Sequence, residues 1–241
     1  MADHMIPIEL PRASGVRPLH FTILTGSLIV LTLAYMAYVS ARWSGYWRGE
    51  IVWTADRTEV AISVNDQNLL VPASLMRSRM AKIALGNGRE RRASLELAAI
   101  WPAMTAARNA QHLTSADLMR GSNLVLVDIT ANQGTETMRD RLDTVYRRLA
   151  RGPETDGPAG LKVLTLSSPV ALELDQVVFE PNRANGFIAR CKATQGKNAV
   201  CHRAASADGN LAVSYRFERG LLSSWGRLDR RVNDLIEALR Q

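Results

Sequence analysis

The sequence predicts an α+β protein in which one N-terminal transmembrane helix precedes a mixed globular domain that ends in a β-meander and an amphipathic helix. Three observations support this fold class. An uncharged apolar run covers residues 21–41, short alternating apolar runs recur after residue 58, and residues 223–241 repeat apolar side chains at helical spacing. Strand and helix patterns are mixed without a regular βαβ rhythm, which favours α+β.

The apolar run Phe21–Ala41 is long enough to cross a membrane. It lacks charged residues, and at about 1.5 Å per residue a helix over it spans roughly 31 Å, the thickness of a bilayer's hydrocarbon core. A cleaved signal peptide is the alternative. Its apolar region is usually about 7–15 residues long and ends in small residues, whereas Arg42 and Trp43 follow this run. We therefore predict an uncleaved anchor.

The charges that flank the run leave its orientation undecided. Arg12 and Arg17 precede it, while Arg42 and Arg48 follow it, so the positive-inside count is tied. Aromatic side chains after the run indicate a membrane interface at that end. They are Trp43, Tyr46 and Trp47. The predicted divisions are a tail at 1–20, the membrane helix at 21–41, a juxtamembrane stem at 42–57 and the globular domain at 58–241.

The globular domain contains alternating patterns typical of strands and amphipathic patterns typical of helices. We expect a hairpin at 58–72 with a loop at 65–68, a helix at Ser74–Ile83, strands at 94–100 and 124–129, a helix at 135–150 and a strand at 161–166. The helix at 135–150 should bury Met138, Leu142, Val145 and Leu149. Residues 167–185 show no regular pattern. Strands at 186–193, 199–204 and 211–218 form the predicted meander before the terminal helix.

Two cysteines, Cys191 and Cys201, lie in the first two strands of this meander. A hairpin centred on Gly196 places them directly opposite each other, with Cβ atoms about 4.5–5.5 Å apart and near the reach of a disulfide. A disulfide would indicate an oxidising compartment, and so a tail inside and a domain outside. Free thiols and a metal site that includes His202 are the alternatives, although the latter lacks a fourth ligand at ligand spacing.

Most of the net positive charge after the run lies in residues 77–92, which we call the basic segment. The net charge of the chain is +7. A local excess of cations suits contact with an acidic partner or anionic lipid, and a solvated basic face is the alternative. The segment has no aromatic residue for stacking on bases, so no nucleic acid partner is expected. Its cations are Arg77, Arg79, Lys82, Arg89, Arg91 and Arg92.

The sequence contains no recognisable catalytic motif. G-x-S-x-G, a phosphate-binding loop and C-x-x-C are all missing, and no cofactor or metal is expected. Three carboxylates lie close together in the sequence, at Glu173, Asp175 and Glu180. They could be paired catalytic acids, but a solvated loop is the simpler interpretation. Tyr215 and Phe217 alternate along one strand and are expected to face the core.

Several short motifs follow the anchor. They are Val71-Pro72, Arg89-Glu90-Arg91-Arg92, Trp101-Pro102, Arg190-Cys191, Cys201, Tyr215-Arg216-Phe217 and Trp225. Together they resemble a group of uncharacterised proteobacterial proteins that have a single membrane anchor and one periplasmic domain. The resemblance implies a bacterial inner-membrane protein with residues 1–20 in the cytoplasm and the main domain in the periplasm. It implies no activity and supplies no catalytic residues.

The resulting hypothesis is a non-enzymatic, membrane-anchored periplasmic scaffold or accessory subunit of a cell-envelope complex. The basic segment would contact another membrane or periplasmic protein, or anionic lipid. The main alternative is an envelope enzyme acting on peptidoglycan or lipid, with Glu173 or Asp175 in a cleft. A third possibility is a cytosol-facing domain that binds nucleic acid.

Overall fold

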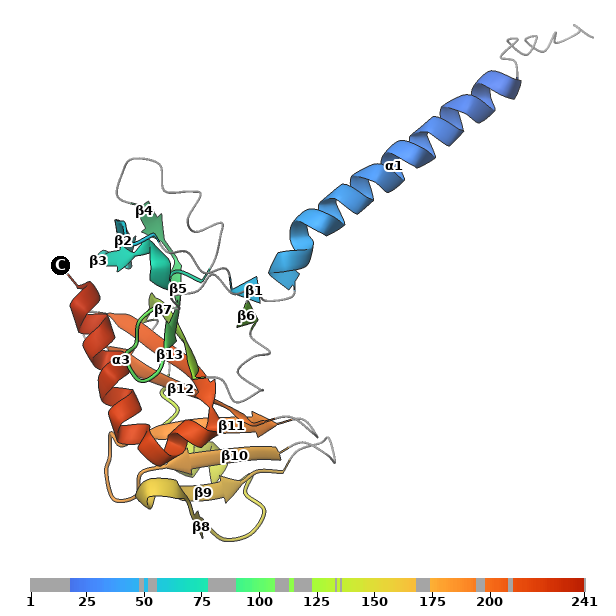
Figure 1. Ribbon diagram of the computed structural model, residues 1–241. Coiled ribbons are helices and arrows are strands. Elements are labelled where there is room, and N and C mark those ends of the chain that lie inside the picture. The colour runs from blue at the N-terminus through green and yellow to red at the C-terminus, as the bar shows by residue number, and fades with distance from the viewer. Residues whose placement is uncertain are drawn as a thin grey trace, which may run out of the picture. The chain divides into compact units, whose positions relative to one another are not determined.

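The computed structural model shows two units, Met1–Trp47 and Arg48–Gln241 (Figure 1). The residues described are 18–47, 50–51, 56–77, 90–106, 113–114, 123–132, 134, 136–167, 174–193, 198–207 and 210–240.

The helix α1 (Pro18–Trp47) forms the described part of the first unit. Its segment Leu19–Ala41 is long and apolar enough to cross a membrane, although a signal sequence near the N-terminus passes the same test. The hydroxyls of Thr25 and Thr32 donate to the carbonyls four residues earlier, at 2.9 and 2.8 Å. These two hydroxyls are therefore satisfied within the helix itself. The side chains of the predicted interface anchors Trp43, Tyr46 and Trp47 lie outside the described residues.

The described part of the second unit is built on an eight-stranded antiparallel sheet with the order β5-β7-β13-β12-β11-β10-β9-β8. The strands are β5 (Ser94–Ile100), β7 (Leu124–Ala131), β8 (Thr155–Asp156), β9 (Lys162–Thr165), β10 (Leu174–Phe179), β11 (Ile188–Ala193), β12 (Val200–Ala207) and β13 (Leu211–Glu218). The predicted meander is confirmed as β11, β12 and β13. β10 corrects the expectation that residues 167–185 are irregular throughout.

Two smaller sheets accompany the large one. Their strands are β1 (Glu50–Ile51) paired with β6 (Leu113–Thr114), and β2 (Glu59–Val64), β3 (Gln67–Pro72) and β4 (Glu90–Arg92) in the order β3-β2-β4. The β2–β3 hairpin turns at Asn65 and Asp66, whose φ angles are 47° and 63°. Asn and Asp tolerate this left-handed conformation, so the loop has two residues and the longer predicted loop is wrong.

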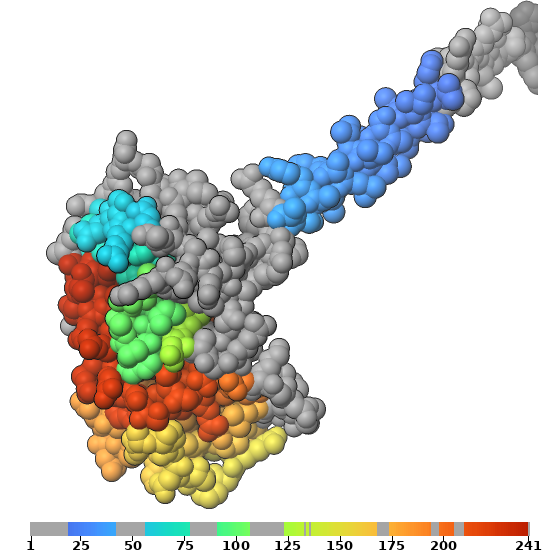
Figure 2. Space-filling view, viewed as in Figure 1, coloured from blue at the N-terminus to red at the C-terminus, as the bar shows by residue number. Residues whose placement is uncertain are grey.

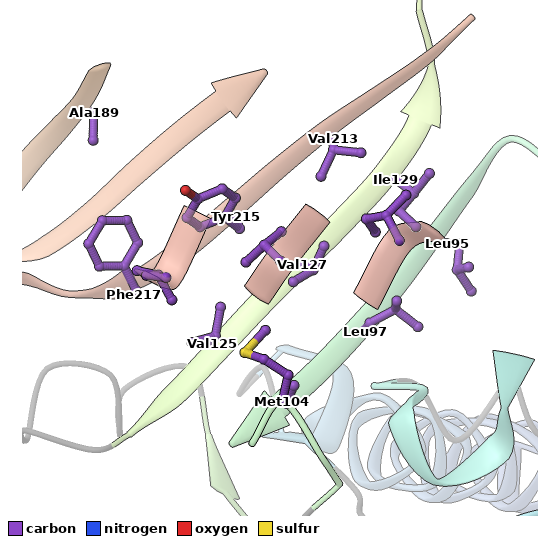
Figure 3. Packing of buried hydrophobic residues seen from close by; sticks show 14 of the residues in the cluster. Leu95, Leu97, Met104, Val125, Val127, Ile129, Ala189, Val213, Tyr215 and Phe217 are labelled. Atoms are coloured by element: carbon purple, nitrogen blue, oxygen red, sulfur yellow. The ribbon is translucent and has the colours of Figure 1, made fainter. Parts of the chain in front are cut away.

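The C-terminal helix α3 (Trp225–Leu239) packs against one face of the large sheet (Figures 1 and 2). A 3-10 turn, η5 (Arg219–Ser224), precedes it. Its apolar side faces the sheet as the spacing predicts, with Leu228, Val232, Ile236 and Leu239 buried. Figure 3 shows the core residues of the strands, among them Val127, Tyr215 and Phe217. Leu69 of β3 bridges to Arg240, which joins the end of α3 to the three-stranded sheet.

The segment before β8 is not the predicted regular α-helix. It contains a π-helical turn, η3 (Leu142–Tyr146), in which the Arg147 N–H donates to the Leu142 carbonyl at 2.9 Å. Because the turn is wider than that of an α-helix, the side chains it buries differ from those that α-helical spacing predicts. Leu142 and Tyr146 are buried against the sheet face opposite α3, whereas Val145 and Leu149 are 36% and 49% exposed.

The predicted helix at Ser74–Ile83 is wrong at its beginning. η1 (Ala73–Leu75) is a single 3-10 turn, and Met76 has extended backbone (φ −71°, ψ 130°) that pairs with Leu97 of β5. Residues 78–83 lie outside the described residues. A further 3-10 turn, η4 (Pro158–Gly160), links β8 and β9.

Candidate functional site: a charged row across the sheet

Cys191 and Cys201 are directly opposed in β11 and β12, and their Sγ atoms are 2.01 Å apart. The predicted pairing is confirmed, so neither sulfur is available as a free thiol or metal ligand. Both residues are buried in the core beneath α3. Successive side chains of a strand point to opposite faces, so Arg190 and His202, the neighbours of these cysteines, face the other side of the sheet.

The described cations of the basic segment are already in contact with carboxylates or half-buried. Arg77 is 20% exposed and its Nη2 lies 2.8 Å from Glu96, while the exposed Arg91 lies 3.0 Å from Asp66. Arg92 is half-buried. The remaining cations, Arg79, Lys82 and Arg89, lie outside the described residues. A contact role for the basic segment stays a prediction, and the structure adds that Arg77 belongs to the large sheet's face.

That face, opposite α3, carries charged side chains from six neighbouring strands. Strand register and side-chain alternation place them together. We call this set the charged row. From one end to the other it comprises Glu96, Arg77, Asp128, Arg216, His202, Arg190, Asp175 and Lys192.

Three basic side chains are directly opposed in the middle of the row. Arg216 of β13 pairs with His202 of β12, which pairs with Arg190 of β11. Neighbouring strands lie about 4.8 Å apart, so a protonated His202 would stand directly opposite a like charge on each side, which destabilises a sheet. The two arginines form their ion pairs away from His202, Arg216 with Asp128 of β7 and Arg190 with Asp175 of β10.

Arg190 and Asp175 form the tightest pair of the row. The Arg190 guanidinium donates from Nε to Asp175 Oδ1 at 2.8 Å and from Nη2 to Asp175 Oδ2. Lys192 Nζ lies 3.8 Å from the same Oδ2 atom. Hydrogen bonding from Arg190 lowers the pKa of Asp175 below its ordinary value of 3.8, against the opposing effect of burial. A carboxylate held ionised in this way is unsuited to act as a general acid.

Asp128 is shared between two arginines at longer distances. Its Oδ2 lies 3.4 Å from Arg216 Nη2, and its Oδ1 lies 3.6 Å from Arg77 Nη1. Arg77 Nη1 and Asp128 Oδ1 are buried atoms for which the described residues supply no hydrogen-bond partner. Arg216 is consequently held less firmly than Arg190, and its side chain is 34% exposed.

His202 lies between the two arginines and is exposed. Desolvation by the surrounding strands lowers its pKa, and the nearby Arg216 lowers it further, while Asp128 acts in the opposite direction. The imidazole is therefore neutral at pH 7. Within the described part of the chain, no carboxylate forms an ion pair with it.

A second ionic group lies on the α3 face and joins the helix to the sheet. Arg203 donates from Nε and Nη2 to Asp229 at 2.8 and 3.2 Å, and the Tyr215 hydroxyl donates to the same carboxylate at 2.7 Å. The Arg203 guanidinium also lies over the Phe187 ring, 4.7 Å from its centroid. Burial raises the pKa of Tyr215 well above its usual value, so the hydroxyl remains a donor. These contacts hold α3 against the sheet.

The two described carboxylates considered for catalysis, Asp175 and Glu180, do not converge on one site. Asp175 is bound by Arg190, the Glu180 carboxylate accepts the Phe187 N–H at 3.2 Å, and Glu173 lies outside the described residues. A pocket of about 510 Å³ at the ends of β10–β13 has Glu218 and Arg219 in its lining. The described residues hold no group of three potential metal ligands.

The charged row was not anticipated from the sequence. Arg190, His202 and Arg216 each interrupt an apolar pattern on their strands, and that interruption is the available signal. It does not reveal that the three are neighbours, because register and strand order bring them together.

No protein-family model and no curated protein sequence matches the chain. Two solved structures are similar in fold. One is the immunity protein Smlt3025 of the Stenotrophomonas maltophilia type IV secretion system, with a TM-score of 0.50 and 16% identity over 77% of this chain and 94% of that one. The other is the Neisseria meningitidis iron-regulated outer membrane lipoprotein FrpD, with a TM-score of 0.47 and 7% identity over 79% and 96%. The first likeness shows a shared fold, and the second carries no argument.

Proposed function

We propose that this protein is a membrane-anchored, non-enzymatic accessory subunit of a cell-envelope complex, and that its globular domain binds a protein partner in the periplasm. The charged row is the observation that carries the proposal. It spans six adjacent strands, five spacings of about 4.8 Å, and so extends about 24 Å. That extent suits the footprint of a protein better than that of a small molecule.

The location is supported by α1 and by the disulfide. α1 has the length and composition of an anchor, and a bond between Cys191 and Cys201 suits an oxidising compartment. A C-terminal alkaline phosphatase fusion should be active in a bacterial host, and a fluorescent-protein fusion at the same place should be dark. The reverse result would place the domain in the cytosol and remove the envelope role.

Binding is favoured over catalysis by the state of the carboxylates. The acid best placed for an enzyme, Asp175, is ionised and occupied by Arg190. The similar solved structure is an immunity protein of a secretion system, which is consistent with an accessory role rather than with turnover of peptidoglycan or lipid.

Site-specific photo-crosslinking tests the proposal directly. A photoreactive amino acid at Lys192, exposed on the row, should cross-link one discrete protein in intact cells. The same amino acid at Glu237, exposed on the outer side of α3, is the matched control and should not give that product. Cross-linking at both positions alike, or only to lipid, would count against a protein-binding row.

The basic segment supplies a second contact in this proposal. Reversing the charge of Arg89, Arg91 and Arg92 should weaken the Lys192 cross-link in low salt and have less effect in high salt, because exposed charges act at long range and are screened. If the Lys192 cross-link is unchanged at both salt concentrations, the basic segment does not take part in the contact.

A further inference from the structure

The sign of charge alternates along the row except at its centre. Glu96, Arg77, Asp128 and Arg216 alternate from one end, and Lys192, Asp175 and Arg190 alternate from the other. Between Arg216 and Arg190 stands His202, which is exposed and has no ion-paired carboxylate among the described residues. The row is therefore one anion short at the His202 position.

We propose that a carboxylate side chain of the protein partner binds over His202, between the Arg216 and Arg190 guanidinium groups. This deepens the proposed function and rests on it. A carboxylate there would lie about one strand spacing, roughly 4.8 Å, from each flanking strand. That distance is within reach of both guanidinium groups and of the imidazole.

The source of the anion is argued from the shape of the site. The N–H groups of β11, β12 and β13 are used in the ladders between these strands, so side chains alone are available to an anion over His202. A small free anion would contact only the side chains of Arg216, His202 and Arg190. A protein gains the complementary contacts along the rest of the row, including those with the exposed Lys192 and Glu96.

The same geometry makes binding depend on pH. The charged groups that face His202 are Arg216 from β13, Arg190 from β11, and Asp128 from β7. An added carboxylate favours the imidazolium, so the pKa of His202 rises on binding. By linkage, the carboxylate binds more tightly at a pH where His202 becomes protonated.

The probe is a blocked tetraglutamate peptide, added to the full chain in detergent micelles with ¹³C-labelled histidine. The chain has 4 histidines, and His202→Gln identifies the His202 signal. We expect tetraglutamate, but not tetraglutamine, to move this signal saturably and to bind several-fold more tightly at pH 5.5 than at pH 7.5. Arg216→Gln should weaken binding about tenfold, the effect of losing one charge-assisted hydrogen bond. Arg227→Gln, exposed on α3, should have no effect.

Two results with the purified chain would overturn the inference. One is a His202 signal that responds equally to tetraglutamate and tetraglutamine. The other is inorganic phosphate binding at lower concentration than the peptide, which would make the row a small-anion site. In cells, a Lys192 cross-link that is insensitive to His202→Gln and to pH would reject this inference alone, whereas loss of the cross-link in the wild type would reject the proposed function.

Discussion

On the α3 face of the large sheet, the Arg203 side chain is 10% exposed and holds Asp229 with two hydrogen bonds, and Tyr215 adds a third. On the opposite face, Arg216 is 34% exposed and its single contact with Asp128 is 3.4 Å long. Both pairs join an arginine to an aspartate across neighbouring elements. Burial and the number of hydrogen bonds separate them, so the first fixes a helix on a sheet while the second leaves guanidinium donors exposed to solvent.

Removing Asp229 should produce the largest effect. Asp229→Ala leaves the buried Arg203 without its counter-charge and should lower the free energy of unfolding by about 4 kcal/mol. Urea unfolding of the full chain in detergent, followed by tryptophan fluorescence, measures this. Asp234→Ala on the exposed side of the same helix should change it by less than about 0.5 kcal/mol. Equal effects of the two substitutions would show that the Arg203 pair does not secure α3.

Removing the disulfide should rank second. The bond closes a loop at a sequence separation of 10, so the double variant Cys191→Ala/Cys201→Ala should lose about 3 kcal/mol of unfolding free energy. Mass analysis of native protein without reductant should show the two sulfurs joined, and both are fully buried. Two free thiols in native protein would show that the bond does not form, and one argument for an oxidising compartment would then be lost.

Asp175→Asn should have a smaller, pH-dependent effect, of about 2 kcal/mol at neutral pH. The folded-state pKa of Asp175 is lowered from 3.8, so its stabilising contribution is complete above that value and is lost as the pH falls through the folded pKa. The difference in unfolding free energy between wild type and variant should therefore be constant above about pH 5 and shrink below pH 4. A difference that grows with acidity would contradict the assigned Arg190 pair.

Asp128→Asn should have the smallest effect on stability, below about 1 kcal/mol, because its ion pairs are long and partly exposed. The substitution should also affect binding. Because Arg216 loses a competing carboxylate, tetraglutamate should bind to the variant more tightly than to the wild type. A loss of stability as large as that of Asp229→Ala would mean that both faces are equally structural.

The elements predicted correctly have strong local patterns. The apolar helix α1, the strands β11 to β13 and the stripe of α3 each follow one periodicity over many residues. The opposed cysteines lie in two paired strands whose register could be counted from the sequence. These features depend on neighbours in the chain, so residue spacing was sufficient to find them.

The elements predicted wrongly depend on distant neighbours. β10 has no clean alternation, because Asp175 is buried on one face by Arg190 while Val177, Val178 and Phe179 fill cores on both faces. The turn at 142–146 widened to π geometry, which spacing for an α-helix does not describe. In both places contacts with the sheet overrode the local pattern.

Residue spacing alone established an apolar helix, an antiparallel meander, a cysteine pair and a terminal amphipathic helix, because each is set by residues a few positions apart. Strand order and register decided the charged row, which joins Glu96 to Arg216 across residues far apart in the chain. The tertiary fold also decided which arginine–aspartate pair is buried and which faces solvent, because an ion pair's role depends on how much water it has lost.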